Sequence, residues 1–561
     1  MINKRCYDNS MHNINEKNKV AHDDEYQELV ENPVAYFCTE YALTDDMPMA
    51  GGLGVLAADT VREAYDQGLP MVAIGLFYDK GYETTSRLSG RIFTPEEFGL
   101  KPVLDRSGEK VSVSVECMNK DVVVKAFVYD QGSIPIYFLT TNVEENESEE
   151  SKITEYLYVN DRKTRFLQEM IIGIGGVKLL EALGINPSVY HMNDSYSALL
   201  SFELAKNIMK SQNVSQAEAL ELASKKIAYT NHTLVAAGND AFEQKEVEKY
   251  LSRYALVNNL NLKELVLHGH VSGEELFSMT ILALKMAYKI NCVSKIHAEK
   301  AKVIWPEFSI RAITNGIHIP TWDLSTNQDL IVSHRDNKRE LIKYINNHKG
   351  LEWQEEDLII CWAKRIVSYK RPFALFENIE KLTQLVNQPE RKIRIIVSGI
   401  AHAGDSECQE AINKIRGYTD KELRGNLVFL ENYSTELARK LTSGSDVWLN
   451  TPEVGWEACG TSTMKAALNG TLVCSTKDGW LDEVGLEKIG WTLENAKINK
   501  SILDTIENKI IPEFFQSGQD EFGNDWKTKM NSARLLIMED FSTAKMINNY
   551  FKDLYLPIEQ N

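Results

Sequence analysis

The sequence lacks the features of membrane-spanning and secreted proteins. No uninterrupted apolar run reaches membrane-spanning length, and the stretch MINKRCYDNSMHNINEKNKVAHDDEY has no apolar core of the kind a signal peptide needs. The eight cysteines are scattered and form no C-x-x-C pair, which favours reduced thiols over a disulfide framework. We therefore expect a cytoplasmic protein without a membrane partner, and a flexible polar arm over residues 1–30.

Positive charge is also scarce. Lysine and arginine together number 62 against 80 aspartates and glutamates, so the formal net charge is −18. A nucleic-acid groove needs clustered positive charge, so nucleic acid is not an expected partner. The composition, with 43% apolar and 25% charged residues, is that of an ordinary globular protein. A chain of 561 residues is too long for one hydrophobic core, so two domains or more are expected.

Short apolar strands alternate with longer helical patterns along most of the chain. This alternation predicts an α/β fold with two doubly wound, mainly parallel sheets. We place the first domain over residues 31–320 and the second over residues 321–535, and we expect a C-terminal helix over residues 536–561 to cross back onto the first domain. The stretch MTILALKMAYKI, which ends at Ile290, is expected to be helical. The predicted strands begin at Val34, Met71, Val122, Ile134, Ser188, Lys226, Asp357, Lys392, Leu427, Asp446 and Thr471.

Ligands of open α/β sheets bind beyond the carboxyl ends of strands, so the cleft between the two domains is the expected site. The first stretch of interest is AGGLGVLAAD, where Gly51 and Gly52 open a helix whose N–H groups could approach an anion. Gly52, Gly54 and Ala57 also match G-x-G-x-x-A, so a dinucleotide site is an alternative. About ten residues separate these glycines from the preceding strand, whereas the dinucleotide fingerprint follows its strand directly.

A cluster of cations follows another strand. The stretch AKRIVSYKR places Lys364, Arg365, Lys370 and Arg371 just beyond a buried strand in an otherwise acidic chain. A solvated basic patch is the plain alternative. An anionic ligand explains two pairs of cations better, because arginine clamps phosphate oxygens in a fork and lysine supplies a point charge.

Neutral polar side chains gather at other strand ends. Asn193, Asp194, Asn231, His232 and Asn315 offer donors and acceptors suited to hydroxyl groups, with one carboxylate among them. Each of them alone would more often be a turn residue. Together they predict a polyol or sugar site.

The stretch EACGTSTMKAALNG joins Glu457 to Lys465 across a turn rich in small residues. A helix that begins near Gly460 offers orphan N–H groups to an anion, and helical side chains lean toward the N-terminus. Lys465 could therefore hold a carbonyl compound whose phosphate lies against Thr461 and Ser462, which suggests pyridoxal phosphate as a Schiff base. A surface lysine on a helix is the alternative, and spacing alone does not exclude it.

Six segments resemble, in the same order, signature segments of the α-glucan (glycogen, starch, maltodextrin) phosphorylases, most of all their shorter bacterial and archaeal branch. They are AGGLGVLAAD, YTNHT, TNGIHIPTW, AKRIVSYKR, FLENY and EACGTSTMKAALNG, and the likeness covers roughly Val34 to Glu483. It implies two facing Rossmann-like domains of the glycosyltransferase B fold, with glucan on the N-terminal domain and pyridoxal 5′-phosphate on Lys465 of the C-terminal one. The implied reaction moves the terminal glucose of an α-1,4-glucan onto inorganic phosphate, with retention, giving α-glucose 1-phosphate.

The resemblance also implies a mechanism and a set of site residues. The cofactor phosphate would pass a proton to substrate phosphate, which would protonate the leaving glycosidic oxygen. No metal is implied, and dimers are common in the family, so a homodimer is one expected assembly. Thr461, Ser462 and Tyr433 would surround the cofactor; Lys364, Arg365, Lys370, Gly51 and Gly52 would bind the two phosphates; and His232, Asn315, Glu457, Cys459 and Gly460 would hold the glucosyl unit, with Asn193 and Asp194 beside them.

Two other functions stay open from the sequence. Related sugar-nucleotide transferases place a second glutamate where Lys465 stands, and would need a nucleotide sugar but no cofactor. A glucan-binding relative without catalysis is suggested by Tyr196 and Val367, where the family commonly has histidine. The chain also departs from the family pattern at Cys459, where serine is common, and at Thr463, where glycine or asparagine is common. No D-x-D occurs in the chain, which argues against a metal-dependent transferase of the other main fold.

Overall fold

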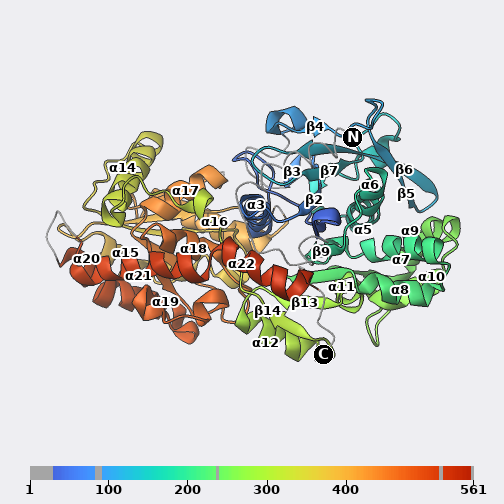
Figure 1. Ribbon diagram of the computed structural model, residues 1–561. Coiled ribbons are helices and arrows are strands. Elements are labelled where there is room, and N and C mark those ends of the chain that lie inside the picture. Colours follow the sequence, from blue (N-terminus) through green and yellow to red (C-terminus); the bar gives the residue numbers. More distant parts are fainter. Residues whose placement is uncertain are drawn as a thin grey trace.

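The computed structural model consists of two α/β units joined along the chain and by a C-terminal crossing segment (Figure 1). It describes residues 29–82, 91–234, 239–402, 404–431, 433–516 and 522–556. Nearly all of the polar arm expected at the N-terminus lies outside these residues. The two-sheet α/β architecture predicted from the sequence is confirmed.

The first unit is built on a ten-stranded mixed sheet. Seven strands run parallel in the order β14-β13-β10-β9-β1-β2-β7, and β6 adds antiparallel pairs with β7, β4 and β5. Strand β1 lies near the middle, and all four of its residues are buried. The strands are β1 Val34–Phe37, β2 Met71–Leu76, β4 Lys101–Pro102, β5 Ser112–Cys117, β6 Lys120–Tyr129, β7 Ile136–Thr140, β9 Val189–Asn193, β10 Ile227–Asn231, β13 Lys289–Cys292 and β14 Ile310–Ala312.

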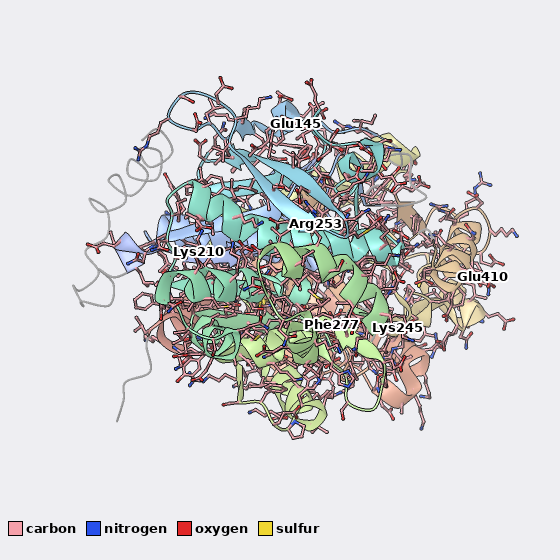
Figure 2. The ribbon with its side chains drawn as sticks, turned by 90° about the vertical axis from the view of Figure 1, so that its right-hand side faces the viewer. Glu145, Lys210, Lys245, Arg253, Phe277 and Glu410 are labelled. Carbon is pink, nitrogen blue, oxygen red and sulfur yellow. The ribbon has the colours of Figure 1, made fainter. Side chains whose placement is uncertain are left out.

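Helices cover the faces of this sheet. Close packing explains the glycine-rich run after Met170, since a Cβ atom at Gly176 would lie 2.6 Å from the Phe37 ring. On the outer side, Arg253 binds Asp121 of the β5–β6 hairpin through two hydrogen bonds of 2.7 Å (Figure 2). The main helices are α3 Gly52–Asp66, α5 Arg162–Met170, α6 Gly176–Ala182, α7 Leu200–Gln212, α8 Gln216–Ser224, α9 Gln244–Val257, α10 Leu262–Gly269, α11 Met279–Met286 and α12 Lys295–Ile304.

The second unit is built on a six-stranded sheet in the order β17-β16-β15-β18-β19-β20, in which all five neighbouring pairs are parallel. Its strands are β15 Leu358–Ala363, β16 Ile393–Ser398, β17 Leu427–Leu430, β18 Val447–Asn450, β19 Leu472–Ser475 and β20 Gly490–Thr492. Its main helices are α14 Leu330–Lys349, α15 Ile379–Val386, α16 Ser406–Thr419, α17 Thr435–Gly444, α18 Thr461–Leu468, α19 Ile498–Thr505, α20 Ile511–Phe515 and α21 Asn524–Asp540.

A buried ion pair fixes α14 to the second sheet. Lys338 Nζ lies 2.8 Å from Asp446 Oδ2 and donates to the carbonyl oxygen of Asp357 at 2.8 Å. Asp446 also accepts the N–H of Ile359 at 2.7 Å. Lys338 is 1% exposed and Asp446 is fully buried, so each charge depends on the other.

The C-terminal segment crosses back onto the first unit, as expected. Helix α22 (Thr543–Tyr550) packs against α3 and lies between the two units in Figure 1. Thr543 Oγ1 donates to Glu63 Oε2 at 3.0 Å, and the hydroxyl of Tyr555 lies 2.8 Å from Nδ1 of the fully buried His191. The C-terminal helical segment is interrupted at Phe541–Ser542. Helix α21, which precedes this interruption, packs on α14 and α18 of the second unit.

One helix prediction was too long. The helix over MTILALKMAYKI ends at Met286, and Lys289–Cys292 forms strand β13, which pairs with β10. A short apolar run fits a buried helix and a buried strand equally well, so pairing with a neighbouring strand decides between them. Across the described residues, no helix is long and apolar enough to cross a membrane.

Candidate functional site

The predicted site residues lie at or beyond the carboxyl ends of strands in both sheets, namely β1, β9, β10, β14, β15, β17 and β18. Direct contacts between the two units bring these ends together. Ser294 Oγ donates to the carbonyl oxygen of Ala458 at 2.6 Å, and Thr314 Oγ1 donates to Glu483 Oε1 at 2.8 Å. The site is therefore assembled from both units.

Three cations converge on one carboxylate. Lys370 Nζ lies 2.9 Å from Glu457 Oε2, and Lys364 lies beside Lys370 with its Nζ hydrogen-bonded to Asn450 Oδ1. Burial lowers the pKa of Lys364 to about 7, and the charge of Lys370 adds to this effect. Burial alone would raise the pKa of Glu457, but Lys370, Lys364 and Arg365 together hold it below its ordinary value. Glu457 is thus the counter-ion of this cage and offsets part of its positive charge.

The fourth cation of that stretch has another role. Arg371 donates to the carbonyl oxygens of Thr451 (2.8 Å), Pro452 (2.6 Å) and Asn495 (3.1 Å). Its guanidinium therefore ties loops of the second unit together, and its expected part in anion binding is wrong. The four cations cannot be told apart in the sequence, because backbone carbonyls and anions attract the same donors.

The glycine loop faces the cage from the first unit. A Cβ atom at Gly51 would lie 3.7 Å from Arg365 Cδ, and the same atom at Gly52 would meet open space. A buried carboxylate that the sequence reasoning missed holds the loop: Glu40 accepts the N–H of Ala50 at 2.8 Å and the hydroxyl of Tyr158 at 3.0 Å. Burial raises the pKa of Glu40 to about 6.

Lys465 is a buried amine with an aromatic face beneath it. It is 6% exposed, and its Nζ lies 4.0 Å from the ring centroid of Trp322. Its Nζ makes no hydrogen bond or ion pair with any residue that the structure describes, although the backbone carbonyl of Lys465 accepts from Asn469 Nδ2 at 2.9 Å. Burial lowers its pKa to about 8. The alternative of an ordinary surface lysine is therefore wrong.

The start of the lysine helix has unused polar groups. Gly460 precedes α18 with a left-handed φ of +83°, which places the N–H groups of the first turn at the end of the loop from β18. The hydroxyls of Thr461 and Ser462, both half-buried, make no hydrogen bond to other residues of the described ranges. Tyr433 packs against the apolar cluster that contains Trp322 and Met464.

The polar residues predicted for hydroxyl groups divide into two sets. His232 Nε2 donates to Asn193 Oδ1 at 2.5 Å, and burial lowers the pKa of His232 to about 3, so its ring is neutral. Asn315 is 4% exposed, and its Oδ1 has no partner among the described residues. In contrast, Asp194 caps its own turn by accepting the N–H of Ser195 at 2.9 Å, and Asn231 donates to the hydroxyl of Tyr229 in the core.

A second carboxylate that the sequence reasoning missed shapes the Glu457 loop. Asp478 Oδ2 accepts three consecutive N–H groups, those of Gly455 (2.8 Å), Trp456 (3.1 Å) and Glu457 (2.9 Å). Cys459, 4% exposed, follows in the same loop. The only sequence signal for Asp478 is its place after strand β19, where a turn residue is equally expected.

Tyr196, where the resemblance implies a histidine, has a packing role. The guanidinium of Arg165 lies over both Tyr158 and Tyr196, at 4.8 and 4.9 Å from their ring centroids, and the two rings pack on each other with centroids 5.6 Å apart. Arg165 in turn binds Asp240 at 2.8 Å. Because Tyr158 also binds Glu40, this stack supports the glycine loop from behind.

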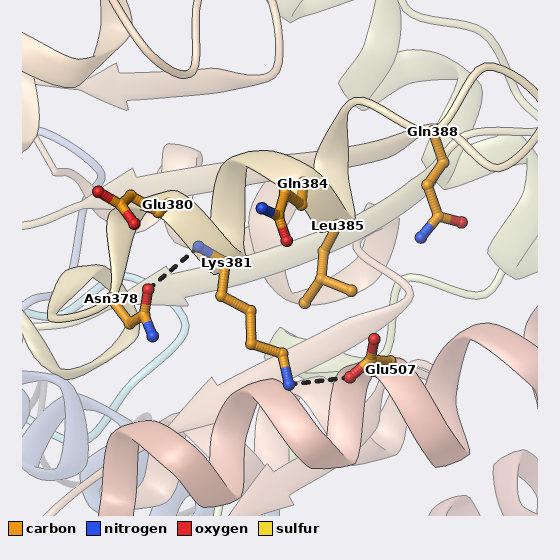
Figure 3. A pocket seen from close by; sticks show the side chains of 7 residues that line it. All are labelled: Asn378, Glu380, Lys381, Gln384, Leu385, Gln388 and Glu507. Atoms are coloured by element: carbon orange, nitrogen blue, oxygen red, sulfur yellow. Dashed lines mark hydrogen bonds and ion pairs between the residues drawn. The ribbon is translucent and has the colours of Figure 1, made fainter.

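A hollow elsewhere on the second unit carries none of the predicted residues. It measures about 280 Å³ and lies between α15 and the helical turn Ile506–Ile510 (Figure 3). Lys381 at its edge lies 2.9 Å from Glu507 and 3.2 Å from Asp504, so its charge is neutralised. Within the described ranges, no group of three or more His, Cys, Asp or Glu side chains could hold a metal ion.

The structure thus combines a mixed and a parallel α/β sheet with a cation cage and a buried lysine on the loops and helices that follow their strands. The sequence model of the carbohydrate phosphorylase family matches residues 185–334 and 321–492. The chain belongs to the carbohydrate phosphorylase family.

Relatives match over most of the chain. It is 31% identical to the maltodextrin phosphorylase of Thermococcus litoralis, over 94% of this chain and 70% of that protein. It is 29% identical to the glycogen phosphorylase of Aquifex aeolicus, over 95% of this chain and 87% of that protein. With the glycogen phosphorylase of Mycobacterium tuberculosis it shares 27% identity over 94% of this chain and 71% of that protein.

Proposed function

We propose that this protein is an α-glucan phosphorylase, a glycosyltransferase that moves the terminal glucosyl unit of an α-1,4-glucan onto inorganic phosphate to give α-glucose 1-phosphate with retention. Family membership supports the reaction class. The observation that carries the proposal is the buried, unpartnered amine of Lys465 on the helix that follows the loop of Glu457, the carboxylate held by the cage of Lys364, Arg365 and Lys370. A sugar-nucleotide transferase has no use for a buried, unpartnered lysine at this position.

The residues around Lys465 fit pyridoxal 5′-phosphate. The cofactor requires an amine that can lose its proton near neutral pH, an apolar face and an anion site. Lys465 has a pKa lowered to about 8 and stands over Trp322, while Thr461 and Ser462 offer free hydroxyls at a helix start. Once bound, the cofactor would supply its phosphate as a proton donor and acceptor beside the substrate phosphate.

The cage would bind inorganic phosphate. Two phosphates in contact repel strongly, since unit charges 4 Å apart interact by about 4 kcal/mol even at an effective dielectric constant near 20. Lys364, Arg365 and Lys370 would offset this repulsion, with Gly51 and Gly52 bringing backbone N–H groups to the same place. The depressed pKa of Lys364 means that an arriving phosphate would draw a proton onto it, because the anion favours the charged amine.

The glucosyl unit would lie between the cage and the first unit. Asn315 Oδ1 is a buried acceptor without a partner among the described residues, and it would accept a hydrogen bond from a sugar hydroxyl. His232 is neutral and held by Asn193, so it would act as a hydrogen-bonding group and not as a general acid. Glu457, released from Lys370 by the arriving phosphate, would accept a second sugar hydroxyl beside Cys459 and Gly460. Asp194, which accepts the N–H of Ser195, would shape the turn that follows Asn193.

One set of measurements tests the function. Purified protein supplied with pyridoxal phosphate should show the near-ultraviolet absorbance of a lysine-bound pyridoxal, and borohydride should fix the label on Lys465. With glucan and phosphate, the same protein should release glucose 1-phosphate. Protein that never binds the cofactor would overturn the proposal in favour of a sugar-nucleotide transferase, and labelled protein without glucose 1-phosphate would indicate a glucan-binding relative.

The Asp478→Asn variant should use glucan less efficiently than the wild type. In the wild type, the loop N–H groups donate to a carboxylate oxygen of Asp478. In the variant an NH₂ group, itself a donor, takes the place of one oxygen, so these N–H groups lose their acceptor and the Glu457 loop loses its shape. We expect kcat/KM for glucan to fall roughly 10- to 100-fold, which corresponds to about 1.5–3 kcal/mol. Steady-state kinetics with varied glucan measure this effect. Asp482→Asn, four residues along and exposed, is the matched control; equal losses in both variants would contradict the role of Asp478.

A further inference from the structure

A buried carboxylate of the first unit shares Trp322 with Lys465. Asp59, on α3, is 1% exposed and accepts the indole N–H of Trp322 with both oxygens, at 3.0 and 2.9 Å. The Lys465 amine stands over the face of the same indole, 4.0 Å from its ring centroid. The indole thus separates a buried anion from a buried cation, and the two come from different units.

Asp59 has only weaker charged neighbours elsewhere. Arg62, whose side chain is partly exposed, places its Nη1 3.9 Å from Asp59 Oδ1, and the ring of His318 also favours the ionised carboxylate. Asp59 also accepts the backbone N–H of His318 at 3.3 Å, which contributes no net charge. Burial raises the pKa of Asp59, and the charge of Lys465 is the strongest influence that opposes this rise.

The charged groups that face Lys465 come from two helices. Asp59 on α3 favours the protonated amine, and Arg439 on α17, 5.8 Å from the Trp322 ring centroid, disfavours it. Arg439 is itself paired with Asp45 at 3.0 Å, which weakens its influence. Asp59 is therefore the main favourable charge acting on the amine, in surroundings where water does not screen it.

We propose that Asp59 is a positioning residue that acts through Trp322 and its own charge to hold the nitrogen of Lys465 in the positively charged state. The carboxylate orients the indole edge-on, and the indole face supports the amine. The first unit thereby controls the charge of the lysine that the second unit supplies. The importance of this charge for a bound aldehyde cofactor rests on the proposed function. The effect of Asp59 on the charge of Lys465 does not depend on that function.

The test measures the charge of Lys465 without relying on activity. The protein is freed of bound aldehyde with hydroxylamine and treated with acetic anhydride over a range of pH, and acetylation of Lys465 is followed by mass spectrometry. Only the neutral amine reacts, so the rate reports the unprotonated fraction. With a pKa of about 8, roughly one tenth of the amine is neutral at pH 7.

Asp59→Asn keeps the shape of the side chain and an acceptor for the indole but removes the charge. We expect its acetylation profile to move to lower pH, so that the rate at pH 7 rises about fivefold, below a ceiling of about tenfold. Asp59→Ser is a second uncharged replacement in case the first does not fold. Glu63→Gln is the matched control, because Glu63 lies one turn along α3 and binds Thr543 instead; its profile should follow the wild type.

The outcomes separate this inference from the proposed function. If Asp59→Asn and Asp59→Ser both follow the wild-type profile, the role of Asp59 is wrong, whether or not the protein binds pyridoxal phosphate. If the profiles shift but the wild type never takes up pyridoxal phosphate on Lys465, the charge relation holds and the proposed function fails. If Glu63→Gln shifts as far as Asp59→Asn, the effect is a general one of the helix and the inference is overturned.

Discussion

Lys465→Met should abolish glucose 1-phosphate formation while making the cofactor-free protein more stable. Without the amine there is no covalent attachment for the cofactor, so we expect kcat to fall on the order of 10⁴-fold or more. Burial lowers the pKa of Lys465 to about 8 from an ordinary value near 10.5. Keeping this amine protonated in the folded state therefore costs roughly 3 kcal/mol at pH 7, which methionine removes.

The gain in stability should depend on pH in a defined direction. Between about pH 8 and 10.5 the unfolded chain binds more protons at Lys465 than the folded chain does, so the wild type becomes more stable as pH rises through this window. The difference between wild type and Lys465→Met should be largest at pH 7 and shrink toward pH 10.5. Urea unfolding of the cofactor-free proteins at several pH values measures it.

Lys338→Met provides the contrast. Lys338 is also buried but is paired with Asp446, so its removal leaves this buried carboxylate with only the ring of His334, 3.5 Å away, and the N–H of Ile359 as partners. We expect a loss of about 3–5 kcal/mol in the free energy of unfolding at pH 7. If Lys465→Met were destabilised to the same degree, Lys465 would have a partner in the folded protein and its role as a free amine would be wrong.

The sequence was sufficient to predict the inner parallel strands such as β1, β2, β15 and β16, because these are buried on both faces and read as continuous apolar runs. Strands β4, β5, β14 and β20 were not predicted. It also identified the lysine helix and the cation cage, since Lys465 and the stretch from Lys364 to Lys370 are local motifs. The β13 strand was missed because its pairing with β10 involves a residue far away in the chain. A local sequence pattern predicts the structure that a segment favours by itself. It does not reveal strand pairing with a segment far away in the chain.

The three carboxylates that the sequence reasoning overlooked share one property. Glu40, Asp59 and Asp478 each bind groups that have no recognisable spacing in the sequence: backbone N–H groups of a loop, an indole more than 260 residues away, or a turn from another strand. Their chemistry is visible only once the fold has brought the partners together. Each of the three holds or influences a residue that the sequence motifs identified. The sequence therefore indicated the candidate site residues but not the carboxylates that position them.

Glu457→Gln should change phosphate binding and turnover in opposite directions. In the ligand-free protein Glu457 occupies the cage, 2.9 Å from Lys370, and competes with phosphate for the same cations. Removing its charge should tighten phosphate binding about tenfold, or roughly 1.4 kcal/mol. The same change weakens acceptance of a sugar hydroxyl in the transition state, so kcat should fall on the order of 10²- to 10³-fold.

Isothermal titration with inorganic phosphate and steady-state kinetics measure the two effects separately. Glu453→Gln, exposed and four residues earlier in the same loop, is the matched control and should change neither quantity. Weaker phosphate binding by Glu457→Gln would mean that the carboxylate organises the cage instead of competing for it. In that case Lys364, Arg365 and Lys370 would need Glu457 to hold them apart, and phosphate would bind beside the carboxylate instead of in its place.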